Sequence, residues 1–208
     1  MRQSDKNQKG ASSLPTSRLS TLTDGVFAIV MTLLAFDVVD AAAGVTSFET
    51  LVSEIGPKLF AYALSFTILG LFWNAHHIAF HYTERTDRAH LWLGIVFLLF
   101  VALIPVPAEL LGEWPISRLA VVTYGVTLAL SALSFDLQWA YATRGRRLTS
   151  PTLPASVVHA LHQRLWVALA SYALGVVIGL WSPPLGVALF VLSHVSLALT
   201  PVAPAERS

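Results

Sequence analysis

Residues 18–39 read RLSTLTDGVFAIVMTLLAFDVV, a long apolar run with Arg18 and Asp24 near its start. An apolar run of about 20 residues is long enough to cross the hydrocarbon core of a bilayer as a helix. An ionisable residue inside such a span is costly, so Asp24 is expected to face protein or water and to have a partner. Arg18 is six positions away, about 600° around the helix, and so cannot be that partner within the same helix.

Five further apolar blocks follow, and the whole chain has the composition of a membrane protein. It has 208 residues, of which 55% are hydrophobic and 12% charged, and its mean hydropathy is +0.65. The blocks are continuous, whereas the strands of an outer-membrane barrel alternate apolar and polar residues. We therefore predict an all-α, polytopic membrane protein with six transmembrane helices, near residues 18–39, 57–80, 89–110, 117–142, 160–181 and 184–200.

The charged residues orient these spans and limit the partners. Of the 13 Lys and Arg residues, only Lys58 and Arg118 fall on one side of the predicted membrane, so the other side is predicted to be cytoplasmic. A flexible tail at 1–17 and a short tail at 201–208 are then both cytoplasmic and flank a transmembrane domain at 18–200. The net charge of +1 indicates no nucleic-acid partner, and the absence of cysteine excludes disulfides and thiolate metal sites.

Two motifs resemble those of a known family of channels. The first span carries the pattern R-x-x-x-L-T-D followed by GVFAI, and the second ends in W-x-x-H-H. They are similar to the R-x-x-x-F-S-D signature and the W-x-x-H-H pattern of bacterial TMEM175 potassium channels, with two conservative changes, Leu for Phe and Thr for Ser. The matching positions are Arg18, Leu22, Thr23, Asp24, Trp73, His76 and His77.

The resemblance implies a homotetramer in the cell membrane, in which the first helix of each six-helix subunit lines a central pore. It implies passive, modestly selective conduction of potassium ions, with no enzyme activity, cofactor or resident metal. The implied partners are further copies of the chain, potassium ions and membrane lipids. Carried over by position, the constriction falls at Ile29, with Leu33 and Phe36 further along and Thr32 as the polar neighbour that influences cation preference.

Helix geometry puts these four residues on one face. At about 100° per residue they share a stripe about 100° wide and about 10 Å long. Asp24 lies about 130° from the centre of the stripe, so we expect it to face a neighbouring helix and to accept a hydrogen bond from Trp73, His76 or His77. Such a polar network would anchor the first helix. The same spacing is also typical of plain helix packing, so it does not by itself distinguish a pore from a core.

The histidines leave a second functional class open, a secondary transporter or a transition-metal carrier that uses His76, His77 and His81. His77 and His81 are one helical turn apart, and imidazole is a common zinc ligand. Neither an H-E-x-x-H pattern nor a cysteine accompanies them, which weighs against a metal site. A membrane scaffold without transport activity is a third alternative.

Three remaining features are interpreted as structural or as lipid contacts. Asp136, in the fourth span, is expected to pair with Arg144 or Arg164 at the cytoplasmic surface or to snorkel towards it. The basic segment at 144–147, RGRR, is placed to touch anionic lipid headgroups. The fifth span presents a face of small residues suited to close helix packing, which comprises Ser171, Gly175 and Gly179.

Overall fold

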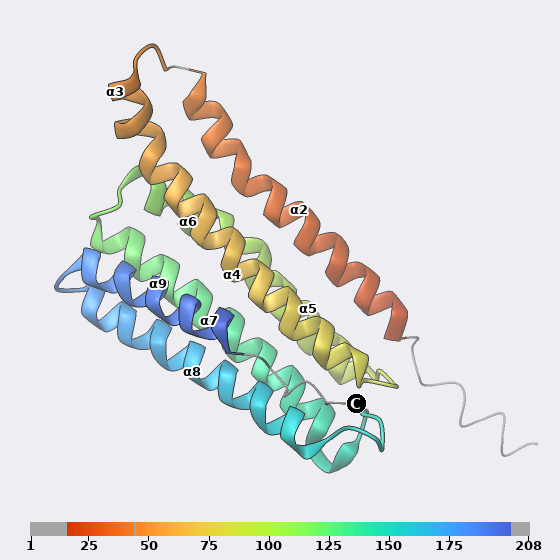
Figure 1. Cartoon of the computed structure of the whole chain (residues 1–208). Coiled ribbons are helices and arrows are strands. Elements are labelled where there is room, and N and C mark those ends of the chain that lie inside the picture. The colour runs from red at the N-terminus through yellow and green to blue at the C-terminus, as the bar shows by residue number, and fades with distance from the viewer. Residues whose placement is uncertain (1–15, 44, 201–208) are drawn as a thin grey trace, which may run out of the picture.

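The computed structural model describes residues 16–43 and 45–200 and is built from helices (Figure 1). The tails predicted at 1–17 and 201–208 lie outside the described residues, except for Thr16 and Ser17, which begin the first helix. The helical elements are α2 (Thr16–Ala42), α3 (Phe48–Thr50), the π-helical η1 (Leu51–Ile55), α4 (Gly56–His81), α5 (Arg88–Leu103), α6 (Pro105–Glu113), α7 (Arg118–Thr143), the 3-10 helix η2 (Arg144–Arg146), α8 (Ala155–Gly179) and α9 (Pro183–Leu199).

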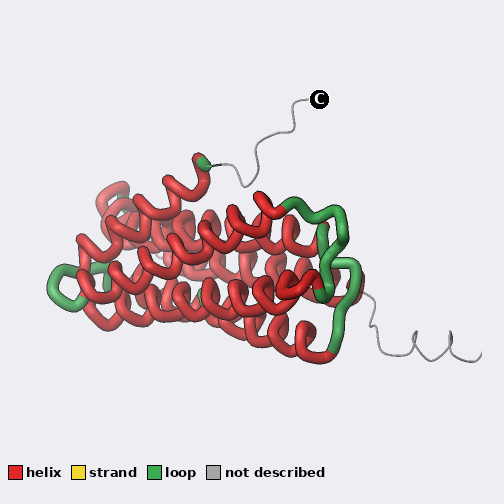
Figure 2. Tube along the Cα trace, turned by 90° about the horizontal axis from the view of Figure 1, so that it is seen from below, coloured by secondary structure: helices red, strands yellow, loops and turns green. Residues whose placement is uncertain are grey.

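The predicted all-α membrane fold is confirmed. Five helical stretches are long and apolar enough to cross a membrane, and α9 is a shorter apolar helix of 17 residues. The long helices run side by side along one axis, and the loops gather at the two ends of the bundle (Figure 2). The six predicted spans therefore correspond to α2, α4, α5 with α6, α7, α8 and α9.

The two largest differences from the predicted spans each have a local reason. The third span is two helices, because Pro105 has no backbone N–H to continue the ladder and Ile104 instead donates to the Val101 carbonyl. The second helical stretch begins nine residues before the predicted start, at Phe48. There, Ser47 forms a capping box with Thr50 and satisfies N–H groups that a helix start leaves open.

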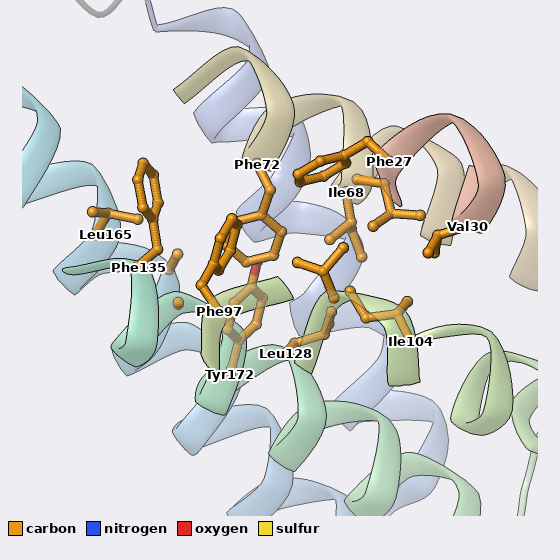
Figure 3. Close-up of a cluster of buried hydrophobic side chains, with 14 of the residues drawn as sticks. Phe27, Val30, Ile68, Phe72, Phe97, Ile104, Leu128, Phe135, Leu165 and Tyr172 are labelled. Atoms are coloured by element: carbon orange, nitrogen blue, oxygen red, sulfur yellow. The ribbon is translucent and has the colours of Figure 1, made fainter. Parts of the chain in front are cut away.

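The helices are buried to very different extents. Helix α7 lies in the middle of the bundle and packs against α5, α6 and α8, whereas α2 lies at one edge and contacts α4, α5 and α6 (Figure 1). Aromatic rings fill the core between α2, α4, α5 and α7, where Phe97 lies 5.1 Å from Phe135 and 6.1 Å from both Phe27 and Phe72, ring centre to ring centre (Figure 3).

Small residues let α7, α8 and α9 approach closely. Phe190 of α9 sits against Gly125 of α7 and Gly175 of α8, where an added Cβ would lie 2.7 Å and 2.2 Å from its ring atoms. Gly179 is buried against Val121. Gly175 and Gly179 of the predicted small-residue face of α8 thus pack against other helices. Ser171 of that face is partly exposed, and its hydroxyl donates to the Val167 carbonyl in its own helix.

Candidate functional site

The four residues of the predicted stripe lie on the face of α2 that the rest of the subunit leaves uncovered. Ile29, Leu33 and Phe36 are 61%, 44% and 65% exposed, and Thr32 is also exposed. The opposite face of the helix packs into the bundle through Leu19, Thr23, Phe27, Val30 and Leu34. The stripe is therefore not part of the core of its own subunit, and it is available to lipid, to a second subunit or to a pore.

Thr32 brings a polar group to this apolar face. Its hydroxyl donates to the Ile29 carbonyl, one turn earlier, at 2.7 Å. That bond uses the only hydroxyl proton, so the Thr32 oxygen remains an acceptor on the exposed side of the helix. An acceptor oxygen one turn from an exposed isoleucine is chemically suited to contact a partly hydrated cation.

Asp24 is tied to α4 by a side-chain hydrogen bond. The indole Nε1 of Trp73 donates to Oδ1 of Asp24 at 2.9 Å, and the Trp73 ring stacks on His77 at 5.7 Å. Of the donors considered from the sequence, Trp73 is the one that contacts the carboxylate. The bond joins α2 to α4 and so influences which face of α2 the subunit leaves exposed.

His76 does not belong to this polar group, and that part of the prediction is wrong. It is 3% exposed, and its ring lies 4.1 Å from Phe80 and 5.8 Å from both Phe97 and Phe135. Its neighbour His77 is about 100° further round the helix and shares the face of Trp73. Among the described residues, no atom accepts from or donates to Nε2 of His76.

Arg18 and Thr23 also lie apart from the Asp24 contact. Thr23 is buried, and its hydroxyl donates to the Leu19 carbonyl at 2.9 Å within its own helix. Arg18 is exposed at the start of α2, and the hydrogen bonds found in the described part of the chain do not include one from its guanidinium. Among the described residues, the motif therefore supplies one hydrogen bond between helices, from Trp73 to Asp24, rather than a closed network.

The histidines do not assemble a metal site in the described ranges. His77 and His81 are exposed on α4, and His81 packs edge-on against Tyr82 at 4.9 Å. Across residues 16–43 and 45–200, no three His, Asp or Glu side chains converge on a point that could hold a metal ion. The geometry thus gives the transition-metal alternative no support.

Asp136 has a different partner from the one predicted. Nδ1 of His162 on α8 donates to Oδ1 of Asp136 at 2.6 Å. Arg164 instead donates to the Leu197 and Thr200 carbonyls at the end of α9. The prediction of an arginine partner is wrong because Arg164 is used to cap a neighbouring helix.

At the other end of α2, the structure shows a small polar pocket that sequence reasoning missed. Asp37, Asp40, Lys58 and Glu109 line a cavity of about 60 Å³ between α2, α4 and α6. Lys58 beside it forms an ion pair with Glu113 at 2.8 Å. Asp37 follows Phe36 directly, so its place at this end of the stripe could have been found from the helix alone.

Comparison with known proteins identifies the family. The sequence is 33% identical over 189 residues to a potassium channel of Streptomyces collinus, covering 88% of this chain and 90% of that one. The family model described as "Endosomal/lysosomal potassium channel TMEM175" matches residues 18–105, a range that includes the exposed stripe and the contact between Asp24 and Trp73. The chain belongs to the TMEM175 family.

Other TMEM175 proteins match over different shares of their length. A crystal structure of a lysosomal potassium-selective channel TMEM175 homologue from Chamaesiphon minutus superposes with a TM-score of 0.73 at 25% identity, covering 88% of this chain and 96% of that one. The endosomal/lysosomal proton channel TMEM175 of Gallus gallus is 34% identical over 110 residues, which is 49% of this chain and 22% of that protein. The six-helix arrangement is thus that of a TMEM175 channel subunit.

Proposed function

We propose that four copies of this chain assemble around a central pore and conduct potassium ions passively, with Ile29, Thr32, Leu33 and Phe36 lining the pathway. The observation that carries the proposal is the exposed stripe on α2. Three of its four residues are large and apolar, yet the subunit leaves them uncovered. Membership of the TMEM175 family, with relatives named potassium channels, supports the choice of ion.

The chemistry of the stripe determines how such a pore would work. A ring of four Ile29 side chains is apolar and narrow enough to exclude water, so it blocks ions until it widens slightly. Selectivity must then come from how much of its hydration shell an ion keeps while it passes the ring. The Thr32 oxygen, one turn away, replaces part of the water that the ion gives up.

Asp24 and Trp73 act as positioning residues in this proposal. Their hydrogen bond holds α2 against α4 at one end of the stripe. Rotation of α2 by one residue would move the stripe by about 100°. A fixed rotational setting is therefore needed to keep Ile29 and Leu33 directed towards the pathway.

The orientation in the cell membrane is also part of the proposal. The start of α2, the α4–α5 loop and the α7–α8 loop lie at one end of the bundle (Figure 1). These segments carry Arg18, Arg85, Arg88, Arg144, Arg146 and Arg147. By the preference of arginine for the cytoplasmic side, this end faces the cytoplasm, and both chain termini with it.

Potassium flux into liposomes that contain the purified protein tests the function. We expect passive flux driven by a potassium gradient, and a higher flux from Ile29→Ala, because the smaller side chain widens the ring. Leu174→Ala on α8 is the matched control, since Leu174 is 51% exposed on a helix that packs mainly against α7 and α9. An unchanged flux from Ile29→Ala would remove Ile29 from the pathway.

The same liposomes separate the channel from its alternatives. Flux that saturates with potassium and is coupled to a second gradient would indicate a secondary transporter. A pH-sensitive dye measures proton entry, which matters because the Gallus gallus relative is named a proton channel. Proton entry without potassium flux would overturn the choice of potassium.

A further inference from the structure

The loops between α4 and α5 and between α7 and α8 form one surface at the end of the bundle (Figure 1). The backbone N–H groups of Glu84 and Arg85 donate to the Leu148 carbonyl at 3.0 Å and 3.3 Å, and Ser150 donates to the Tyr82 carbonyl at 2.8 Å. Leu148 is buried beneath them. The two loops are thus docked on each other through their backbones.

This surface is strongly basic. Five exposed arginines project from it, which we call the basic rim: Arg85, Arg88, Arg144, Arg146 and Arg147. The loops contribute two acids, Glu84 and Asp87. Asp87 is already engaged, because it accepts from the His90 backbone N–H at 2.9 Å and from the Tyr141 hydroxyl at 2.8 Å. The ion pairs of the described residues, Lys58 with Glu113 and His162 with Asp136, involve none of the rim arginines.

The backbone of the rim is held in an uncommon conformation. Gly145 and Arg146 have φ values of 64° and 52°, and Arg146 is the one residue other than glycine with positive φ in the described ranges. This left-handed conformation is unfavourable for a residue with a Cβ. It is held by the Leu148 N–H, which donates to the Ala142 carbonyl at 3.1 Å, and by the Arg146 guanidinium, which donates to the Pro151 carbonyl at 2.6 Å.

Aromatic contact fixes a further member of the rim. The guanidinium of Arg147 lies over the Tyr141 ring, 5.2 Å from its centre. The turn at Gly145 thus ends the helix and keeps Arg144, Arg146 and Arg147 together at the surface. The side chains of Arg146 and Arg147 are held by the contacts described above. Such an arrangement is preorganised for an anion, since little side-chain freedom remains to be lost on binding.

We propose that the basic rim binds the phosphate of an anionic phospholipid headgroup. The rim lies where four membrane-spanning helices end, which is the depth of the headgroups in a bilayer. Guanidinium groups donate paired hydrogen bonds to phosphate oxygens, and the acyl chains of the lipid remain beside the helices. The site is separate from the pore stripe, so the proposal does not depend on ion conduction.

Thermal unfolding in vesicles tests the proposal. The native chain should unfold at a higher temperature, by several degrees, in phosphatidylglycerol vesicles than in phosphatidylcholine vesicles with the same acyl chains. The variant R144Q/R146Q/R147Q should lose this difference. Arg118→Gln, which removes an exposed arginine at the opposite end of the bundle, should keep it. Equal unfolding temperatures for the native chain in both lipids, or a full difference in the triple variant, would overturn the proposal.

Further measurements distinguish lipid binding from a general effect of charge and from binding of soluble phosphate. R144K/R146K/R147K keeps the positive charge that orients the membrane spans, and it should retain only part of the lipid difference because lysine lacks the paired donors. In the native chain, about 1 M salt should abolish the difference, since the screening length falls to about 3 Å. If inorganic phosphate raises the unfolding temperature in phosphatidylcholine vesicles to the same extent, the ligand is a soluble phosphate and the lipid assignment is wrong.

Discussion

Helices α2 and α7 have nearly the same length, 27 and 26 residues, but opposite places in the subunit. In the most apolar stretch of α2, 17% of the residues are buried, whereas 56% are buried in the corresponding stretch of the span containing α7, although the α2 stretch is the more apolar of the two. Helix α7 also carries buried polar residues, among them Ser131, Asp136 and Gln138. Inside a membrane, then, apolar character does not indicate the core. Polar residues face other helices, and an exposed apolar face is available to lipid, to a second subunit or to a pore.

The largest expected effect comes from adding one methyl group to the closely packed helices around α7 and one to α2. Gly175→Ala, where α8 meets α9 beside α7, places a Cβ 2.2 Å from the Phe190 ring and should destabilise the fold by up to about 3 kcal/mol. Gly25→Ala on α2 meets nothing within 4 Å and should be neutral or stabilising by about 0.5–1 kcal/mol. Thermal unfolding of the detergent-purified variants measures both. Equal losses would show that α2 is packed as tightly as α8.

A smaller effect is expected where α2 is attached to the bundle. Asp24→Asn weakens the hydrogen bond from Trp73 by removing the charge, and Trp73→Phe removes the donor. Each should destabilise the attachment by about 1–2 kcal/mol and lower the recovery of assembled protein in size-exclusion chromatography. The double variant should lose little more than either single variant. Additive losses would mean that the two side chains act independently.

The smallest effect concerns the stability that ionised Asp87 contributes in the loop before α5, and how this stability depends on pH. Burial raises the pKa of Asp87, but the His90 N–H, the Tyr141 hydroxyl and the charge of Arg147 outweigh it and hold the pKa below its usual value. A lowered pKa in the folded state means that the stabilisation is present above about pH 4 and is lost as the pH falls through the folded value.

Asp87→Asn tests this dependence. Asparagine still caps the helix, so the loss near neutral pH should be at most about 1 kcal/mol, and the part of the acid destabilisation due to this residue should disappear. Unfolding temperatures followed from pH 7 towards pH 3 measure it. Glu84→Gln, an exposed acid in the same loop, is the control. A variant whose acid profile matches the native chain would contradict the assigned role.

The sequence predicted what depends on one helix at a time. Continuous apolar blocks predict the spans, and the wheel of α2 correctly separates the stripe at Ile29 and Leu33 from Asp24, because both depend only on about 100° per residue. The sequence also named Trp73 among three candidate donors to Asp24, because the end of the second helix and the start of the first lie at the same depth when the two helices are antiparallel neighbours. The helix break at Pro105 could also have been predicted, since proline has no backbone N–H to continue the hydrogen-bond ladder of a helix.

What the sequence did not predict depends on how several helices pack. His76 and His77 are adjacent in the motif, but only the packing of Phe97 and Phe135 shows that His76 points into the core. Asp136 and Arg164 looked like a pair by charge, yet Arg164 caps α9 and leaves Asp136 to His162. Charge and spacing identify residues that could form a contact. Which of them meet depends on how each helix is rotated about its axis in the packed bundle.

Accessibility of the stripe tests the central claim most directly. The chain contains no cysteine, so Leu33→Cys and the control Leu174→Cys each introduce the only thiol. A positively charged, membrane-impermeant methanethiosulfonate reagent is added while potassium flux is measured in liposomes. If α2 lines the pore, the reagent reduces flux through Leu33→Cys and leaves Leu174→Cys unchanged. Block of the control alone, or modification of Leu33→Cys without any loss of flux, would contradict the account.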